Sequence, residues 1–150
     1  MKALIQRVKS ASVYVDNRQI SAIGPGILLY LGIGTGDTET DMDFLIKKTQ
    51  ELRIFENEQK KFDLSLGDIK GEIMIVSAFT LMADCRKGKR PDFGNAAPVE
   101  EARKLYGLFV EKFMKTSIRI SEGQFQAYME VKSENDGPVT IMLDSKAGFT

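Results

Sequence analysis

The chain has 150 residues, of which 43% are hydrophobic, and its 21 Lys and Arg residues balance 21 Asp and Glu residues. This length fits a single domain, over residues 1–150, with one core. A net charge of zero excludes the broad positive field of a strongly basic nucleic-acid binder, so any RNA contact has to be local. The chain contains no histidine, which excludes a Ser-His-Asp triad, a Cys-His dyad and a histidine-ligated zinc site.

One cysteine, Cys85, is present, which excludes an internal disulfide and a cysteine-based metal site and fits a reducing compartment. The neighbouring cations Arg86 and Lys87 favour a reactive thiol, but without a histidine partner we interpret this cysteine as incidental. No apolar run approaches the roughly 20 residues that span a bilayer. We therefore expect a cytoplasmic protein that uses no metal or cofactor and does not contact a membrane.

The first part of the chain predicts short strands followed by a helix. Strands are expected over Lys2–Val8, Ala11–Asp16 and Ile27–Leu31. The third follows the turn residues Gly24-Pro25-Gly26 and is apolar throughout, which indicates a central strand covered on both faces. Thr38 is expected to cap a helix, in which apolar residues recur at helical spacing. These apolar residues are Met42, Leu45, Ile46 and Leu52.

The remainder predicts one more central strand, a second helix and closing strands. Residues 57–71 are polar and rich in turn residues, which indicates an excursion before a mid-sheet strand over Glu72–Ala78. Pro98 suits the first turn of the second helix, whose inward face is formed by Ala102, Leu105, Tyr106, Phe109 and Phe113. Closing strands are expected over Ile118–Ile120, Ala127–Lys132 and Val139–Leu143. The predicted fold class is α+β, a mostly antiparallel sheet or open β-barrel with two packed helices.

The glycine-rich segment Gly32-Ile33-Gly34-Thr35-Gly36 follows a strand and precedes a helix, as a phosphate-binding loop does. Asp37 stands where a dinucleotide fingerprint needs its third glycine, and no Lys-Ser or Lys-Thr pair follows. We interpret the segment as a flexible turn, and a nucleotide-binding enzyme is one alternative function.

A dense cationic segment is formed by Arg86, Lys87, Lys89 and Arg90, with Gly88 and Pro91 between them. It is either a solvated surface loop or a patch that positions the phosphates of a nucleic acid, which a chain of zero net charge would need locally.

Two segments lie where buried strands are expected to end or begin. They are Val76-Ser77-Ala78-Phe79-Thr80-Leu81 and Asn135-Asp136-Gly137-Pro138-Val139-Thr140. Each alone is compatible with ordinary turn residues. Together, in this order and at this separation, they resemble the D-aminoacyl-tRNA deacylase family. The resemblance covers essentially the whole chain, including Ala3-Leu4-Ile5-Gln6-Arg7-Val8, Leu52-Arg53-Ile54-Phe55 and Lys87-Gly88-Lys89-Arg90-Pro91.

The resemblance implies a homodimer that hydrolyses the ester joining a D-amino acid, or glycine, to the 3′ acceptor end of tRNA. The family motif Ser-Gln-x-Thr-Leu maps onto Ser77–Leu81, with Ala78 in place of the glutamine. The resemblance implies that Ser77, Phe79 and Thr80 are catalytic residues and that Ala78 contacts the substrate. Backbone amides around Phe79 and Thr80 would stabilise the oxyanion, and the 2′-hydroxyl of the terminal adenosine would help to activate water. Thr80 lacks a base, so we assign it a positioning role rather than covalent attack.

The resemblance also implies how chirality is read. In the family the bond that corresponds to Gly137–Pro138 is cis and enters the partner subunit's site, where it would reject L-residues by steric exclusion. Arg7 would brace this segment, and the four cations Arg86, Lys87, Lys89 and Arg90 would bind tRNA. Two other readings stay open: a non-catalytic RNA-binding or assembly module, which the departure at Ala78 allows, and a relative with a trans Gly-Pro bond that edits L-alanine.

Overall fold

The protein is described by a computed structural model, and the structure describes residues 1–147. Its elements in chain order are β1 (Lys2–Val15), β2 (Arg18–Ile23), β3 (Gly26–Gly32), α1 (Glu39–Glu51), β4 (Phe55–Glu56), β5 (Phe62–Leu64), β6 (Glu72–Ser77), the 3-10 helix η1 (Phe79–Met82), α2 (Val99–Met114), β7 (Arg119–Glu122) and β8 (Glu130–Asp144). No helix within residues 1–147 is long and apolar enough to cross a membrane.

The main sheet is mixed, which corrects the prediction of a mostly antiparallel sheet. Its strands follow the order β2-β1-β3-β6-β7, and β8 pairs with the other edge of β1. β1 is antiparallel to β2, β3 and β8, whereas β3 and β6 are parallel to each other, and so are β6 and β7. The sheet curls until Ser121 of β7 approaches Ala22 of β2, with a hydrogen bond of 3.4 Å. The result is a nearly closed, barrel-like sheet with two helices.

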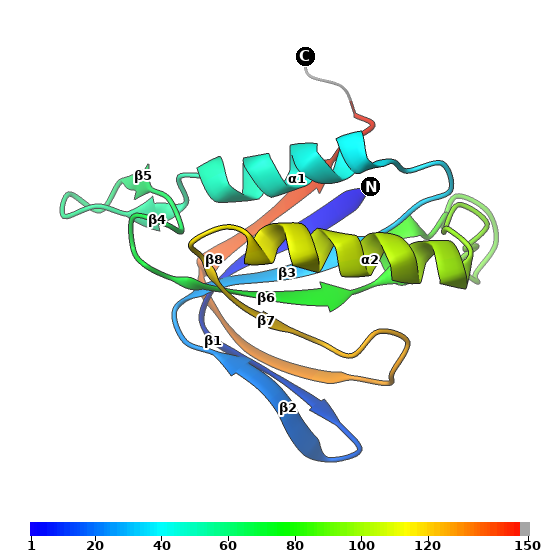
Figure 1. The fold of residues 1–150 in the computed structure, drawn as a ribbon, viewed down its shortest axis with the longest axis horizontal. Helices are drawn as coiled ribbons and strands as arrows, with labels where there is room; N and C mark the ends of the chain where they lie inside the picture. The colour runs from blue at the N-terminus through cyan, green and yellow to red at the C-terminus, as the bar shows by residue number, and fades with distance from the viewer. Residues whose placement is uncertain (148–150) are drawn as a thin grey trace.

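The central strands are those that the sequence predicts to be covered on both faces. β3 is buried at six of its seven positions and β6 at four of its six, so they provide much of the core. Both helices lie over the same face of the sheet (Figure 1). From α2, Tyr106, Phe109 and Phe113 join this core as their helical spacing predicts. Burying large apolar side chains of this kind stabilises the fold by about 1.5–3 kcal/mol each.

The helix predictions are confirmed, whereas several strand boundaries differ. The two N-terminal strands are one continuous strand, β1. Of the predicted strand Ala127–Lys132 only residues 130–132 are in a strand, and they belong with the predicted strand Val139–Leu143 to the long strand β8. The strand β2 was not predicted, because most of its residues are exposed and lack an apolar pattern. The polar excursion over residues 57–71 contains β5, which pairs with β4 in a separate two-stranded sheet.

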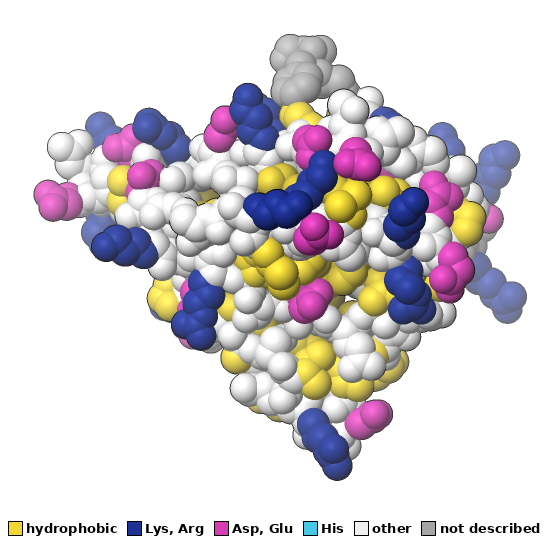
Figure 2. All heavy atoms as spheres, in the orientation of Figure 1, with side chains coloured by type: hydrophobic (Ala, Val, Ile, Leu, Met, Phe, Trp, Pro, Cys, Tyr) yellow, Lys and Arg dark blue, Asp and Glu magenta, His cyan; other side chains and the backbone are white. Residues whose placement is uncertain are grey.

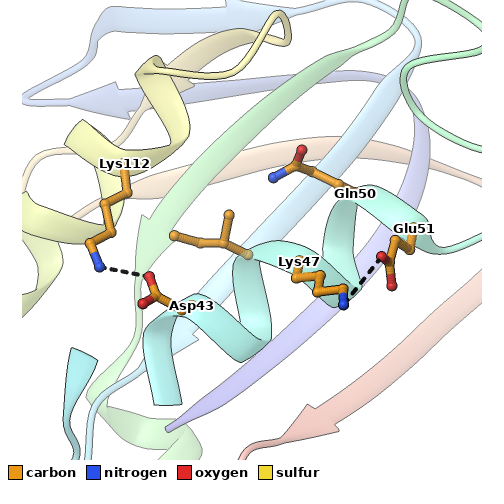
Figure 3. Close-up of a pocket in the computed structure, with 6 residues that line it drawn as sticks. Asp43, Lys47, Gln50, Glu51 and Lys112 are labelled. Atoms are coloured by element: carbon orange, nitrogen blue, oxygen red, sulfur yellow. Dashed lines mark hydrogen bonds and ion pairs between the residues drawn. The ribbon is translucent and has the colours of Figure 1, made fainter. Parts of the chain in front are cut away.

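Side-chain contacts hold the two helices to each other and fix the start of α1. Thr38 caps α1 as predicted, and its amide donates to the Asp41 carboxylate at 2.8 Å, so the two residues form a capping box. Between the helices, Lys112 Nζ lies 2.6 Å from Asp43 Oδ1 and 3.1 Å from Glu39 Oε2. A polar hollow of about 300 Å³ lies beside this bridge, with Lys47 and Glu51 on its rim (Figure 3).

Candidate active site

A mostly apolar cavity of about 660 Å³ opens beyond the end of β6. It is lined by Tyr30, Leu31 and Ile33, by Val76–Thr80, by Phe93 and Ala96–Val99, by Ala102, and by Phe125–Met129 and Val131. Hydrophobic side chains are visible in the space-filling view between α2 and the segment that follows β7 (Figure 2). A pocket of this size, with few polar groups, is typical of small-molecule and substrate sites.

The segment Ser77–Thr80 forms one wall of this cavity, because β6 ends there and η1 begins. The amide of Ala78 donates to the carbonyl of Leu31 at 2.8 Å, which fixes the end of the strand. The N–H groups of Phe79 and Thr80 open η1, and the first turn of a helix leaves such groups without partners inside the helix. They are therefore suited to bind a developing negative charge.

Aromatic side chains stand at the mouth of the cavity. Phe79 is 58% exposed and Tyr128 is 94% exposed, which is unusual for large rings and indicates a binding surface. The Phe79 ring meets the edge of Phe93 with centroids 5.0 Å apart. Such rings are suitable platforms for the bases of a single-stranded nucleic acid.

Two tyrosines near the cavity, Tyr30 and Tyr106, stay uncharged near neutral pH. Burial raises the pKa of Tyr30 above its ordinary value. Burial also raises the pKa of Tyr106, with the Glu122 carboxylate adding to the shift, and the Tyr106 hydroxyl donates to the carbonyl of Ile75 at 3.0 Å. Both tyrosines therefore stay neutral, and neither is suited to act as a general base at pH 7.

The cationic loop leaves the cavity wall directly after η1. Backbone hydrogen bonds of 2.7 and 2.9 Å between Asp84 and Asp92 close its neck. Within the loop, Arg86 Nε lies 2.9 and 3.0 Å from the two carboxylate oxygens of Asp84, and these hydrogen bonds lower the pKa of Asp84 to about 2. Arg86 is thus paired with Asp84 within the loop, although it is exposed like Lys87, Lys89 and Arg90.

The Gly137–Pro138 segment bulges out of the pairing between β1 and β8. Gln6 pairs with Thr140 and Val8 pairs with Asn135, so residues 136–139 face Arg7 alone. The peptide bond between Gly137 and Pro138 is cis, and Gly137 has a φ of +132°, which L side chains rarely adopt.

Arg7 and Asn135 hold the base of this bulge. The Arg7 side chain is 6% exposed, and its Nε donates to the carbonyl of Asp136 at 3.0 Å. The Asn135 amide donates to the carbonyls of Arg7 and Val139 at 2.9 and 3.0 Å. The segment is therefore positioned by hydrogen bonds on both sides.

Within one chain, the bulge and the cavity lie at opposite ends of the central strands. Arg7 is level with Ile27 and Ile73, whereas Ser77 is level with Leu31. These levels are four positions apart on β6, which is about 13 Å at about 3.3 Å per residue. The same separation is visible between β4, near the bulge, and the segment after β6 (Figure 1).

Comparison with known proteins identifies the family. The model of the family described as D-Tyr-tRNA(Tyr) deacylase matches residues 4–144. A D-aminoacyl-tRNA deacylase of Thermosipho melanesiensis is 51% identical over 150 residues, covering 99% of this chain and 100% of the relative. The chain belongs to the D-Tyr-tRNA(Tyr) deacylase family. It is therefore a hydrolase, a D-aminoacyl-tRNA deacylase.

Further relatives and solved structures agree with this family. The D-aminoacyl-tRNA deacylase of Clostridioides difficile is 50% identical over 149 residues, covering 99% of this chain and 100% of the relative. A structure described as c-Myc DNA Unwinding Element Binding Protein superposes with a TM-score of 0.91 at 46% identity, covering 96% of this chain and 98% of the other. A probable eukaryotic D-amino acid tRNA deacylase superposes with a TM-score of 0.74 at 16% identity over 95% and 97% of the two chains, and shows the fold alone.

The structure brings the first deacylase motif together at one cavity but leaves Gly137, Pro138 and Arg7 elsewhere in the same chain. Sequence reasoning missed Phe93, Phe125 and Tyr128 as cavity residues, since Phe93 lies in the segment before α2, the other two lie between β7 and β8, and none belongs to a local pattern. The position of Phe93, just after the cationic segment, was the one weak indication in the sequence that this ring lies near a nucleic-acid site.

The glycine-rich alternative finds no support in the structure. The amide of Gly34 donates to the Asp37 carboxylate at 2.7 Å, and the amide of Thr35 donates to the carbonyl of Asn95 at 3.0 Å. These donors are engaged within the protein rather than presented to a phosphate. Cys85 is an exposed free thiol, and the described residues contain no group of three or more His, Cys, Asp or Glu that could hold a metal ion.

Proposed function

We propose that this deacylase hydrolyses the ester bond of D-aminoacyl-tRNA, and of glycyl-tRNA, and that it rejects L-aminoacyl-tRNA. The observation that carries the proposal is the apolar cavity whose wall is the Ser77–Thr80 motif of the family. Its volume of about 660 Å³ suits an amino acid with the terminal nucleoside of a tRNA. The aromatic rings of Phe79 and Phe93 at its mouth suit stacking with a base.

The chemistry assigned to this cavity needs no titrating side chain. The ester carbonyl is placed against the N–H groups of Phe79 and Thr80, which stabilise the oxyanion that forms when water attacks. Ser77 and Thr80 position the ester, and the tRNA's 2′-hydroxyl helps to activate the water. Loss of one such donor typically costs about 100-fold to 1000-fold in rate, so amides alone provide substantial catalysis.

Chirality is assigned to the main chain at Gly137–Pro138. A wall of backbone admits the hydrogen of a D-residue or of glycine on one side of Cα and clashes with an L side chain. The side chain of the D-residue is not read, so many D-amino acids are accepted. The buried Arg7 braces this wall through the carbonyl of Asp136.

This assignment requires two copies of the chain, because the wall and the cavity lie apart in one copy. A homodimer in which each Gly137–Pro138 segment enters the other subunit's cavity satisfies the requirement. β8 has one edge paired with β1 and its other edge open among the described residues, so it offers a surface for such a contact. A monomer that is fully active at nanomolar concentration would contradict this arrangement.

The exposed cations Lys87, Lys89 and Arg90, with Arg86, are assigned to the phosphates of the tRNA acceptor end. Over the face in view, Lys and Arg are interspersed with Asp and Glu, so attraction to RNA has to be local (Figure 2). The neck at Asp84 and Asp92 holds this loop beside the cavity.

The test is deacylation of D-tyrosyl-tRNA, L-tyrosyl-tRNA and glycyl-tRNA by the purified protein in single-turnover conditions. The proposal predicts release of tyrosine from the D-substrate and of glycine, with the L-substrate intact. Tight tRNA binding without turnover would indicate the non-catalytic RNA-binding module instead. Turnover of L-alanyl-tRNA alone would indicate the editing relative.

A further inference from the structure

The Arg7 guanidinium joins three segments of the chain. Its Nη1 donates to the carbonyl of Ile54 at 2.7 Å, and its Nε donates to the carbonyl of Asp136 and lies 3.3 Å from that residue's carboxylate. Its Nη2 lies 3.8 Å from Glu56 Oε1. A buried cation needs such hydrogen-bond acceptors. Because the N–H donors of a guanidinium lie in one rigid plane, the orientation of this plane fixes the relative positions of the three segments.

A cross-strand pair of the small β4–β5 sheet covers this guanidinium. Glu56 of β4 pairs with Phe62 of β5, and side chains of paired residues lie on the same face. The carboxylate of Glu56 approaches one nitrogen of the guanidinium, and the guanidinium lies over the ring of Phe62, with 5.3 Å from Arg7 Cζ to the ring centroid.

Phe62 does not serve the hydrophobic core. Its side chain is 55% exposed, and it belongs to neither of the two clusters of buried hydrophobic residues that form the core of the described residues. It stands in a segment that is otherwise polar, from Asn57 to Asp63. An aromatic ring in this place is explained by the contact with Arg7 rather than by packing.

The guanidinium in turn touches the turn that carries Gly137. A Cβ built on Gly137 would lie 3.1 Å from Arg7 Nη2, so a rotation of the guanidinium changes the space behind this glycine directly. If the ring of Phe62 is removed, the guanidinium loses this cation–π contact and the Arg7 side chain gains freedom to turn.

We propose that Phe62 is a positioning residue for chiral rejection, because its ring holds the Arg7 guanidinium in the orientation that fixes Gly137–Pro138. Glu56 assists as the cross-strand partner. This inference rests on the proposed function of Gly137–Pro138. It adds that the β4–β5 sheet, which lies far from the cavity of its own chain, acts on substrate selection.

The experiment compares Phe62→Leu, which keeps apolar bulk without a ring, with Phe62→Tyr, which keeps the ring. Lys61→Ala is the matched control, because Lys61 is an exposed neighbour in the same hairpin. Single-turnover rates are measured with D- and L-tyrosyl-tRNA over a range of enzyme concentrations. Circular dichroism and urea unfolding monitor the fold.

For Phe62→Leu we expect the ratio of the D rate to the L rate to fall by about tenfold, which corresponds to about 1.4 kcal/mol. The enzyme concentration that gives half the maximal rate stays unchanged, because the tRNA contacts lie elsewhere. Phe62→Tyr and Lys61→Ala keep the wild-type ratio. A purely structural role would instead lower both rates together and leave their ratio constant.

Two results would overturn the inference: an unchanged ratio in Phe62→Leu, or an equal loss in Phe62→Tyr. If Phe62→Leu does not fold, Glu56→Gln is measured instead, because it removes the charge beside Arg7 and leaves the Phe62 ring in place. An unchanged ratio of the D rate to the L rate in Glu56→Gln overturns the inference as well. Failure of the proposed function itself is separate, since the wild-type protein would then not cleave D-tyrosyl-tRNA at all.

Discussion

Gly137→Ala places a methyl group where the structure leaves no room for it. The new Cβ would lie 2.8 Å from Val139 Cγ2, 3.0 Å from the Val139 amide nitrogen and 3.1 Å from Arg7 Nη2. The Val139 side chain can turn, but the amide nitrogen belongs to the backbone of the same bulge and cannot move independently. The φ of +132° adds strain of about 1–3 kcal/mol for a residue with a Cβ.

The main chain of the bulge therefore has to shift if the strain is to be relieved. A misplacement of about 1 Å in a positioning group can cost about 100-fold in rate, so we expect D-tyrosyl-tRNA turnover to fall by roughly that factor. The free energy of unfolding should fall by about 1–3 kcal/mol at most, which leaves the protein folded at 25 °C.

Phe79→Leu provides the comparison, because the Phe79 side chain lines the cavity but is not part of the Gly137–Pro138 segment that is proposed to reject L-residues. It should lower the D rate while L-tyrosyl-tRNA stays intact. The assay is single-turnover deacylation of matched D- and L-tyrosyl-tRNA by both variants, with circular dichroism to confirm folding. If folded Gly137→Ala keeps normal D activity, or if Phe79→Leu cleaves the L-substrate, rejection is made by side chains and the reasoning is refuted.

Three further predictions concern other parts of the molecule. Ala78→Gln should change the deacylation rate by less than about 100-fold, because the proposed oxyanion donors are backbone amides; a larger activation, seen in the same single-turnover assay, would show that the glutamine carries chemistry. Replacing Lys89 and Arg90 together by Ala should weaken tRNA binding and reduce the slope of log affinity against log salt by about 1.5, as measured by filter binding; an unchanged slope would place the phosphates elsewhere. Asp41→Asn should lower the free energy of unfolding by about 1 kcal/mol at pH 7, because asparagine keeps an oxygen for the Thr38 amide but loses the negative charge that suits the first turn of α1 and pairs with Lys146 Nζ at 2.8 Å. Burial alone would raise the pKa of Asp41, but its hydrogen bonds outweigh burial and hold the pKa well below the ordinary value. The carboxylate's contribution is therefore present above pH 4–5 and is lost as the pH falls, so urea unfolding should show a smaller difference at pH 3 than at pH 7.

The helices and central strands were predictable because each has a strong local pattern. The apolar runs of β3 and β6 predict burial on both faces, but such runs do not distinguish parallel from antiparallel neighbours, and so the mixed sheet was missed. The strand β8 was divided in the prediction because Gly137-Pro138 has the pattern of a turn. In the structure the same residues form a bulge inside one long strand.

The candidate site was predictable only where the residues form a short motif. Ser77, Phe79 and Thr80 follow one strand and share one cavity wall, so their grouping is local. The roles of Phe62 and Phe93 depend on contacts between segments far apart in the chain, with Arg7 and Phe79 respectively. No periodicity or spacing in the sequence encodes contacts of that kind.

The central claim is that each site combines the cavity of one subunit with the Gly137–Pro138 segment of the other, and subunit complementation tests it most directly. Ala78→Trp fills the cavity of one subunit, Gly137→Ala damages the wall carried by the other, and each homodimer alone should lose most of its activity. The two variants are co-expressed with different affinity tags, the mixed dimer is purified through both tags, and D-tyrosyl-tRNA deacylation is measured. The claim predicts that activity returns in the mixed dimer, because one of its two sites then has both parts intact. A mixed dimer as inactive as its parents would contradict it.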